Sequence, residues 1–311
     1  MQVGDYVFMA DAVSKFHRSV YVTGWFRHDA DHLFDVVLIG TDILAQHGEV
    51  GLRHDVVDPE VSPGRGFCLQ CLRKDDRFDD RLTLAFHTAS GRVVTATLLE
   101  LATERAAQSA TARLYHRFVA EVARMHRPLV IDLGGRARSG NERAADFPGA
   151  RFVVADIIGG SNVDIVADAH QLSRHVAPGS VDAVISFATF EHLAMPWKAV
   201  VEINRVMRPG GLACLISHHT IGLHDMPCDY WRFSADTWDA LLNRHTGMEI
   251  IDRSLSDEQF VIPFFYQPDA AHAEQSAGYA FTGVIARKVG AANVDWDVPL
   301  REIVTTPYPD N

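Results

Sequence analysis

The chain has 311 residues, which suggests two domains, and its hydrophobic content of 47% and charged content of 22% are ordinary for a soluble globular protein. Its formal net charge of -11 argues against a nucleic-acid partner, because binding to phosphate backbones depends on basic patches. The apolar runs are too short to span a membrane, and the start Met1–Asp5 lacks the features of a secretion signal. We therefore expect a cytoplasmic protein without a membrane span or a nucleic-acid partner.

Residues 1–101 are predicted to form an accessory β-sandwich domain. Short runs of β-branched and aromatic residues recur there, and turn-rich pieces such as 62–64 and 90–91 separate them. Short strands with turn signals and no helices between them are typical of a small antiparallel sandwich. The expected strands are 19–26, 33–39, 67–72, 82–86 and 93–98.

Residues 102–126 are predicted to form a single helix that connects the two domains. This stretch contains no Gly or Pro, and Pro128 follows shortly after it. Apolar residues recur on one face at helical spacing, namely Leu114, Phe118, Val122 and Met125. We expect this apolar face to pack against the sheet of the second domain.

Residues 127–290 are predicted to form an α/β domain, and residues 291–311 a C-terminal extension. Apolar runs of strand length alternate with helix candidates at 196–207 and 234–244. This alternation indicates a mostly parallel sheet with helices on both faces. The expected strands are 129–133, 151–156, 181–186, 212–217, 248–252 and 280–287.

Acidic residues and glycines stand at the ends of these strands, where ligands bind in open α/β sheets. Asp132 ends the first strand and precedes the pair Gly134-Gly135, which a tight turn would explain as well as a ligand. Asp156 ends the second strand and is either an acceptor for ribose hydroxyls or an exposed loop acid. Asp168 closes a further apolar run and could accept a hydrogen bond from an adenine amino group. The first loop lacks the GxGxxG spacing of dinucleotide-binding domains.

The order of these pieces over residues 127–290 resembles the class I S-adenosylmethionine (SAM)-dependent methyltransferases. The Arg-Pro-Gly-Gly turn at 208–211 is similar to a signature of that family. The resemblance implies a Rossmann-like domain with a mostly parallel seven-stranded sheet, and SAM as the cofactor. In that family the first loop lies against the methionine part of the cofactor, and acids after the second and third strands bind ribose and adenine. The cofactor-binding residues that the resemblance implies are Asp132, Gly134, Gly135, Asp156, Ile157, Asp168, Ala169, His170 and Phe187.

The first loop departs from the family pattern at two positions. The family loop commonly reads Gly-x-Gly-x-Gly, whereas Arg136 and Arg138 stand where later glycines would occur. The Arg-Ala-Arg-Ser-Gly sequence resembles a bacterial subgroup, so we interpret it as variation within the family. We expect the Arg136 side chain to point to solvent rather than to contact the cofactor.

The segment 217–233, just past the strand at 212–217, is rich in side chains that can transfer protons. An oxygen nucleophile usually needs a general base, and a histidine ring suits that role near neutral pH. The alternative is a structural hydrogen-bonded cluster of Asp225, Asp229 and Arg232. The candidate catalytic residues are His219, His224, His192 and Asp225.

A metal ion is also conceivable by residue type, with His218, His219, His224 and Asp225 as ligands. However, adjacent histidines on an extended backbone splay apart. The pair Cys68 and Cys71 also has no second CxxC that would complete a zinc site. The sequence therefore predicts no bound metal.

The segment from His224 to Phe233 is similar to one in methyltransferases of bacterial surface-polysaccharide pathways. The resemblance implies a methyltransferase of polysaccharide biosynthesis that acts on an oxygen of a sugar or other small polar acceptor, so the expected partner is a small molecule or glycan. Two alternatives stay open: a non-catalytic SAM-binding or partner subunit, and a nicotinamide-dependent oxidoreductase.

The aromatic segment 260–268 is interpreted as a lid or as the contact of a homodimer. The N-terminal domain resembles accessory β-domains of glycan-modifying enzymes, and would bind carbohydrate, dock a partner or stabilise the enzyme.

Overall fold

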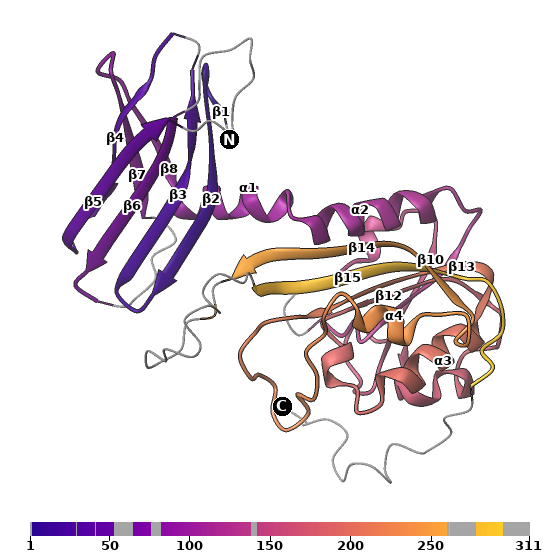
Figure 1. The fold of residues 1–311 in the computed structure, drawn as a ribbon. Helices are drawn as coiled ribbons and strands as arrows, with labels where there is room; N and C mark the ends of the chain where they lie inside the picture. Colours follow the sequence, from indigo (N-terminus) through magenta and orange to yellow (C-terminus); the bar gives the residue numbers. More distant parts are fainter. Residues whose placement is uncertain are drawn as a thin grey trace. The chain divides into compact units, whose positions relative to one another are not determined.

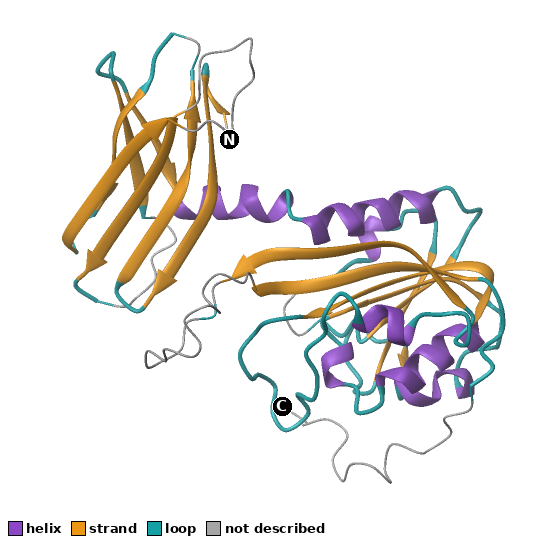
Figure 2. Ribbon diagram, in the orientation of Figure 1, coloured by secondary structure: helices purple, strands orange, loops and turns teal. Residues whose placement is uncertain are grey.

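The computed structural model describes residues 2–28, 30–40, 42–52, 65–75, 82–137, 142–259, 261 and 278–294. The chain divides into two compact units, Met1–Gln108 and Ser109–Asn311, whose elements are labelled in Figure 1 and coloured by type in Figure 2. No helix within the described residues is long and apolar enough to cross a membrane. The predicted segment 260–268 lies outside the described residues apart from Val261, and so does the predicted extension from residue 295 onward.

The first unit contains two antiparallel sheets. Within the described residues, the larger sheet has the order β1 (Gln2–Val3), β2 (Tyr6–Phe16), β3 (Ser19–Arg27), β6 (Arg65–Arg73), β5 (Ile43–Leu52). The smaller sheet has the order β4 (Leu33–Ile39), β7 (Thr83–Thr88), β8 (Val93–Thr97). The predicted small antiparallel strands are confirmed, whereas β1, β2 and β5 were not predicted.

Aromatic side chains from both sheets form one core in this unit. The ring of Phe86 on β7 has its centroid 5.1 Å from that of Phe8 on β2 and 5.2 Å from that of Phe67 on β6. All three side chains are buried. The two sheets therefore pack face to face through these rings, as inward-facing side chains of sandwiches do.

The prediction of one continuous connecting helix over 102–126 is wrong, because the structure has two helices there. The first is α1 (Leu98–Ala107), which begins at a capping box formed by Thr97 and Glu100. The second is α2 (Ala110–Ala123), which begins at Ser109. The Ser109 backbone is extended and its hydroxyl accepts a hydrogen bond from the Ala112 N–H, so this residue starts a new helix instead of continuing the first.

The second unit contains the predicted mostly parallel seven-stranded sheet, counted over the described residues. Its strand order is β11 (Ile165–Val166), β10 (Arg151–Asp156), β9 (Leu129–Leu133), β12 (Val181–Phe187), β13 (Met207–His218), β15 (Gly278–Lys288), β14 (Met248–Gln259). The pairs from β11 to β13 are parallel, and β15 runs antiparallel to both of its neighbours. The chain order reverses at β9, which has β10 on one side and β12 on the other.

Helices cover both faces of this sheet, as predicted (Figure 2). Successive strand residues point to opposite faces, so Val130 joins the core under α2 while Ile131 joins the core on the other side. On that second face lie α3 (Pro196–Val206) and α4 (Thr237–Leu241). The expected helix over 234–244 is thus only partly formed, because the Thr237 hydroxyl accepts a hydrogen bond from the Ser234 N–H before the helix begins.

Candidate functional site

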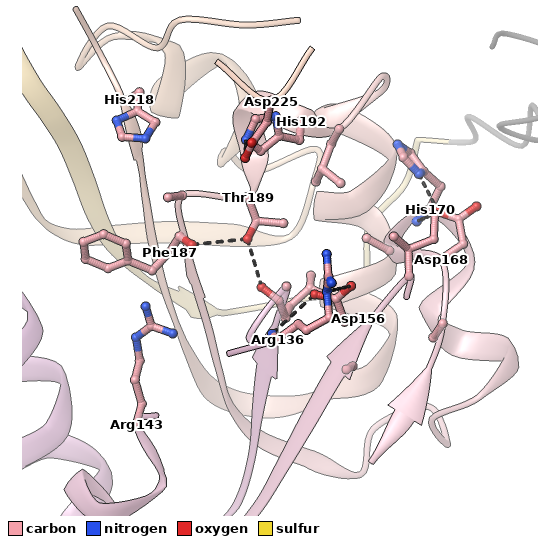
Figure 3. A pocket seen from close by; sticks show the side chains of 18 of the residues that line it. Arg136, Arg143, Asp156, Asp168, His170, Phe187, Thr189, His192, His218 and Asp225 are labelled. Atoms are coloured by element: carbon pink, nitrogen blue, oxygen red, sulfur yellow. Dashed lines mark hydrogen bonds and ion pairs between the residues drawn. The ribbon is translucent and has the colours of Figure 1, made fainter. Parts of the chain in front are cut away.

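A cavity of about 930 Å³ lies at the carboxyl ends of β9, β10 and β12, where the strand order reverses. Open α/β sheets bind their ligands at this position. Its volume is at the upper end of the range of roughly 300–1,000 Å³ that is usual for ligand pockets. In Figure 3 the side chains of His218, His192 and Asp225 lie along one side of the cavity, apart from those of Asp156 and Asp168.

The loop after β9 requires its two glycines for different reasons. Gly134 has a φ of +79°, and a Cβ there would lie 2.1 Å from the Thr189 hydroxyl oxygen. A Cβ on Gly135 would lie 2.4 Å from the carboxyl carbon of Asp132. Gly134 lines the cavity, whereas Gly135 is not among the residues that line it.

Asp132 lies beneath this loop rather than on the cavity wall. It is 2% exposed, and its Oδ2 lies 3.2 Å from the Arg143 guanidinium. Burial raises the pKa of the Asp132 carboxyl, and the nearby Arg143 opposes that shift. Asp132, which the resemblance listed with the cofactor-binding residues, thus packs against Gly135 and is not among the residues that line the cavity.

Asp156 lines the cavity at the end of β10 and is held by the backbone around it. Its Oδ1 accepts a hydrogen bond from Ile158 N–H at 2.9 Å, and its Oδ2 accepts one from Arg136 N–H at 3.4 Å. Ile157, which follows Asp156 in the chain, also lines the cavity.

The expectation that Arg136 points to solvent is wrong. Its side chain is only 16% exposed, lines the cavity, and has its Nε 3.7 Å from Asp156 Oδ1. The attraction of the guanidinium to that carboxylate accounts for the inward orientation. Arg138 lies outside the described residues.

Asp168 and the short 3₁₀ helix η3 (Ala169–Arg174) form another part of the wall. Asp168 Oδ1 accepts hydrogen bonds from the backbone N–H of His170 at 2.9 Å and from its Nδ1 at 2.6 Å. Burial alone would raise the pKa of Asp168, but these hydrogen bonds hold it below its ordinary value. The Nε2 of His170 accepts a hydrogen bond from Met195 N–H at 3.2 Å, so Nδ1 is the ring nitrogen that donates to Asp168. Ala169 and His170 both line the cavity.

Phe187, at the end of β12, lines the cavity with an aromatic face. The Arg143 guanidinium carbon lies 5.1 Å from the centre of this ring, which is within cation–π range. Arg143 also lines the cavity, and sequence reasoning missed it. No motif surrounds Arg143 in the sequence, so only the fold reveals its position.

The side of the cavity with the histidines is built around a buried carboxylate that sequence reasoning also missed. Glu191 lies in the 3₁₀ helix η4 (Phe190–His192), is 0% exposed, and accepts a hydrogen bond from the Ser217 hydroxyl at 2.6 Å. Its other oxygen, Oε1, lies 3.2 Å from Nε2 of His218 and 3.9 Å from Nε2 of His192. Burial lowers the pKa of the His218 imidazole, and the Glu191 carboxylate opposes this shift.

His192, His218 and His224 gather at this carboxylate. The ring centroids of His192 and His218 each lie 5.0 Å from that of His224. Asp225 also lines the cavity, with its Oδ2 4.0 Å from Nε2 of His192. Three of the four candidate catalytic residues, His192, His224 and Asp225, therefore lie together at the cavity.

The structure does not bring His219 to the cavity. Its Nδ1 lies 2.6 Å from the Thr220 hydroxyl, and its ring contacts Tyr279. Successive residues of an extended chain point to opposite sides, so His218 faces the cavity and its neighbour does not. Alternation along the chain indicates that only one of the two neighbours can face the cavity, but it does not say which one.

The expected cluster of Asp225, Asp229 and Arg232 is only partly found. Arg232 binds both carboxylate oxygens of Asp229, at 2.6 and 2.7 Å, and Asp229 also accepts a hydrogen bond from His224 N–H at 2.9 Å. These hydrogen bonds, those from Arg232 first, hold the pKa of Asp229 well below its usual range. Asp225 lies instead on the cavity side, near His192.

Comparison with known proteins finds a family model that matches part of the second unit. Residues 141–215 match the family model described as a methyltransferase domain. The match covers only part of the chain, and it supports SAM as the cofactor.

Solved structures with a similar fold include a SAM-dependent methyltransferase from Archaeoglobus fulgidus, with 16% identity and a TM-score of 0.43 over 57% of this chain and 92% of that one. Another is a SAM-dependent methyltransferase from Aquifex aeolicus, with 16% identity and a TM-score of 0.38 over 56% of this chain and 88% of that one. Both TM-scores lie below 0.5, so these likenesses define neither the reaction nor the substrate. A comparison with curated protein sequences finds no match.

Proposed function

We propose that the protein transfers a methyl group from SAM to an oxygen atom of a sugar or another small polar acceptor. The observation that carries this proposal is the cavity itself. It has two carboxylates, Asp156 and Asp168, on one side and a histidine cluster on the other. One side suits a nucleoside, and the other suits a hydroxyl that must lose a proton.

The residues present fit SAM. The Asp156 carboxylate is fixed by two backbone N–H groups and reaches the cavity, so it can accept hydrogen bonds from vicinal ribose hydroxyls. Asp168, with Ala169 and His170, would bind the adenine, and Phe187 would pack against the cofactor. When bound, SAM supplies an electrophilic methyl group on a sulfonium. The methionine part would lie against Gly134, which lines the cavity in the loop after β9.

His192 is the proposed proton acceptor. Its Nδ1 donates a hydrogen bond to the carbonyl oxygen of Cys228 at 2.7 Å, so the lone pair of the neutral ring is on Nε2. The ring lines the cavity, and the carboxylates of Glu191 and Asp225 lie 3.9 and 4.0 Å from Nε2. These carboxylates would stabilise the positive charge that the ring gains when Nε2 takes the proton of the acceptor hydroxyl. His224 and Asp225 would orient the acceptor.

The polar character of this side of the cavity supports a polar acceptor. Three imidazoles and the Asp225 carboxylate offer hydrogen bonds to hydroxyl groups. The likeness of the segment from His224 to Phe233 to enzymes of surface-polysaccharide pathways supports a glycan or a sugar, and a cytoplasmic location would suit such an enzyme. The N-terminal unit would then bind carbohydrate or dock a partner.

Calorimetric titration of the whole protein tests the cofactor part of the proposal. Saturable binding of SAM and of its demethylated product, with no binding of NAD, is the expected result. Binding of NAD without SAM would favour an oxidoreductase and overturn the proposal.

Turnover measured as release of S-adenosylhomocysteine, over a panel of sugars and small hydroxy compounds, tests the catalytic part. His192→Ala should lower turnover by roughly 10²- to 10⁴-fold, the usual contribution of a general base. His219→Ala is the matched control and should leave turnover unchanged. Full turnover in His192→Ala would exclude His192 as the base, and an absence of turnover with every acceptor would favour a non-catalytic SAM-binding subunit.

A further inference from the structure

One of the two oxygens of the buried Glu191 carboxylate accepts no hydrogen bond from the described residues. Oε2 accepts the hydrogen bond from Ser217, but Oε1 is buried without a hydrogen-bond partner. Burying a charged oxygen is costly unless a positive group or a donor compensates it. Two imidazole nitrogens lie close to Oε1, namely Nε2 of His218 at 3.2 Å and Nε2 of His192 at 3.9 Å.

Glu191, His218 and His224 have the spacing of metal ligands. One carboxylate oxygen and one nitrogen of each ring all lie within 4.8 Å of one another. Metal bonds of about 2.0–2.2 Å place neighbouring ligand atoms about 3–3.5 Å apart, so small adjustments of these side chains would close a coordination sphere. Two imidazoles and one carboxylate are a ligand set found at catalytic zinc centres.

We propose that Glu191, His218 and His224 bind a divalent transition-metal ion of the Zn²⁺ type on the wall of the cavity. The observation that points to the cation is that Oε1 of Glu191 is buried and accepts no hydrogen bond from the described residues, while two imidazoles lie at metal-ligand spacing from it. The argument that adjacent histidines splay apart still holds for His218 and His219. His218 and His224 belong to the ligand set considered from the sequence, and Glu191 in η4 takes the place of His219 and Asp225.

The surroundings of His224 resemble the outer shell of a metal site. Its Nδ1 lies 3.2 Å from the carbonyl oxygen of Gly222 and 3.5 Å from Asp229 Oδ2. Metal-binding imidazoles usually donate their second ring N–H to such oxygens, which fixes the ring and its tautomer. Asp229 is itself held by Arg232 through both carboxylate oxygens. We therefore assign Asp229 a positioning role, although His192, His224 and Asp229 also lie close enough together to bind an ion.

The site would be open toward the cavity, because His218 and His224 both line it. Three protein ligands leave a position for water or substrate, as in catalytic zinc sites. If the proposed methyl transfer is correct, an acceptor hydroxyl would occupy this position, and the metal would make it more acidic. Metal binding itself does not depend on that reaction.

Titration with Co²⁺ tests the site, because Co²⁺ bound by nitrogen and oxygen ligands absorbs visible light. The untagged full-length protein is first freed of metal with a chelator, and Zn²⁺ is then used to displace Co²⁺. One equivalent of Co²⁺ should bind per chain and should be displaced by Zn²⁺. SAM binding is measured in parallel on the metal-free protein, so that failure of the metal site and failure of the methyltransferase proposal give different results.

Two variants and one control locate the metal. Glu191→Gln keeps the shape and the Ser217 contact, and His224→Ala changes a side chain that is 29% exposed and less important for packing. Each should weaken Co²⁺ binding at least tenfold, whereas His219→Ala should not change it. If Glu191→Gln fails to fold, His224→Ala decides the matter. No saturable Co²⁺ binding, or equal affinity in His224→Ala and the unchanged protein, would overturn the proposal and leave a proton shared between Glu191 and His218 as the explanation.

Discussion

Replacing Asp156 by alanine removes the carboxylate that is proposed to bind ribose. In the structure this carboxylate is ready to act, because Ile158 N–H and Arg136 N–H hold its two oxygens at the cavity wall. A hydrogen bond to a charged group contributes about 1.5–3 kcal/mol. In the variant, water bonds to the ribose hydroxyls in place of the carboxylate and offsets part of this loss. We expect SAM affinity to fall by about 1–3 kcal/mol, which is roughly a 5- to 150-fold rise in Kd.

Isothermal titration calorimetry measures this change directly. Asp164→Ala is the matched control, because Asp164 is another carboxylate near the end of β10 that accepts a backbone hydrogen bond, from Val154 N–H at 2.8 Å, but it does not line the cavity. The control should bind SAM like the unchanged protein. Equal affinity in a folded Asp156→Ala variant would refute the placement of ribose at Asp156.

Two further substitutions test the walls of the cavity. Gly134→Ala should lower the free energy of unfolding by about 1–3 kcal/mol, because the positive φ and the contact with Thr189 both oppose a Cβ. Urea unfolding measures this, and unchanged stability would contradict the strain argument. Asp168→Asn should lower stability at neutral pH, because the folded-state pKa of Asp168 lies below its ordinary value of 3.8. The ionised Asp168 carboxylate stabilises the fold above that pH. The difference in free energy of unfolding between the variant and the unchanged protein should therefore shrink as the pH falls below 3.8. A difference that does not change with pH would contradict a stabilising role of the ionised carboxylate.

The sequence predicted the second sheet well because its signals are local and repeated. Runs such as Leu129–Leu133 and Val181–Phe187 are buried on both faces, and a continuous apolar run of strand length indicates a parallel strand of this kind. The acids at the ends of these runs, Asp156 and Asp168, therefore met at one cavity, as their positions at strand ends predicted.

The parts that the sequence did not predict depend on contacts between distant residues. Glu191 is an ordinary acid in the sequence, and only the packing of η4 against the end of β13 buries it beside His218. Arg136 was expected in solvent because its attraction to Asp156 requires the fold to bring the two loops together. The break between α1 and α2 was missed for a different reason, because Ser109 is tolerated inside a helix and nothing nearby identifies it as a cap.

The separate cores of the two units affect how the stability of this chain is to be understood. The aromatic core around Phe86 draws its members from residues up to Leu101, and the clusters on the two faces of the second sheet draw theirs from Leu114 onward. A chain with independent cores need not unfold in one cooperative step. A single melting temperature would then describe neither unit, and calorimetric scans with and without SAM would assign each transition, because only the unit that binds the ligand should melt at a higher temperature.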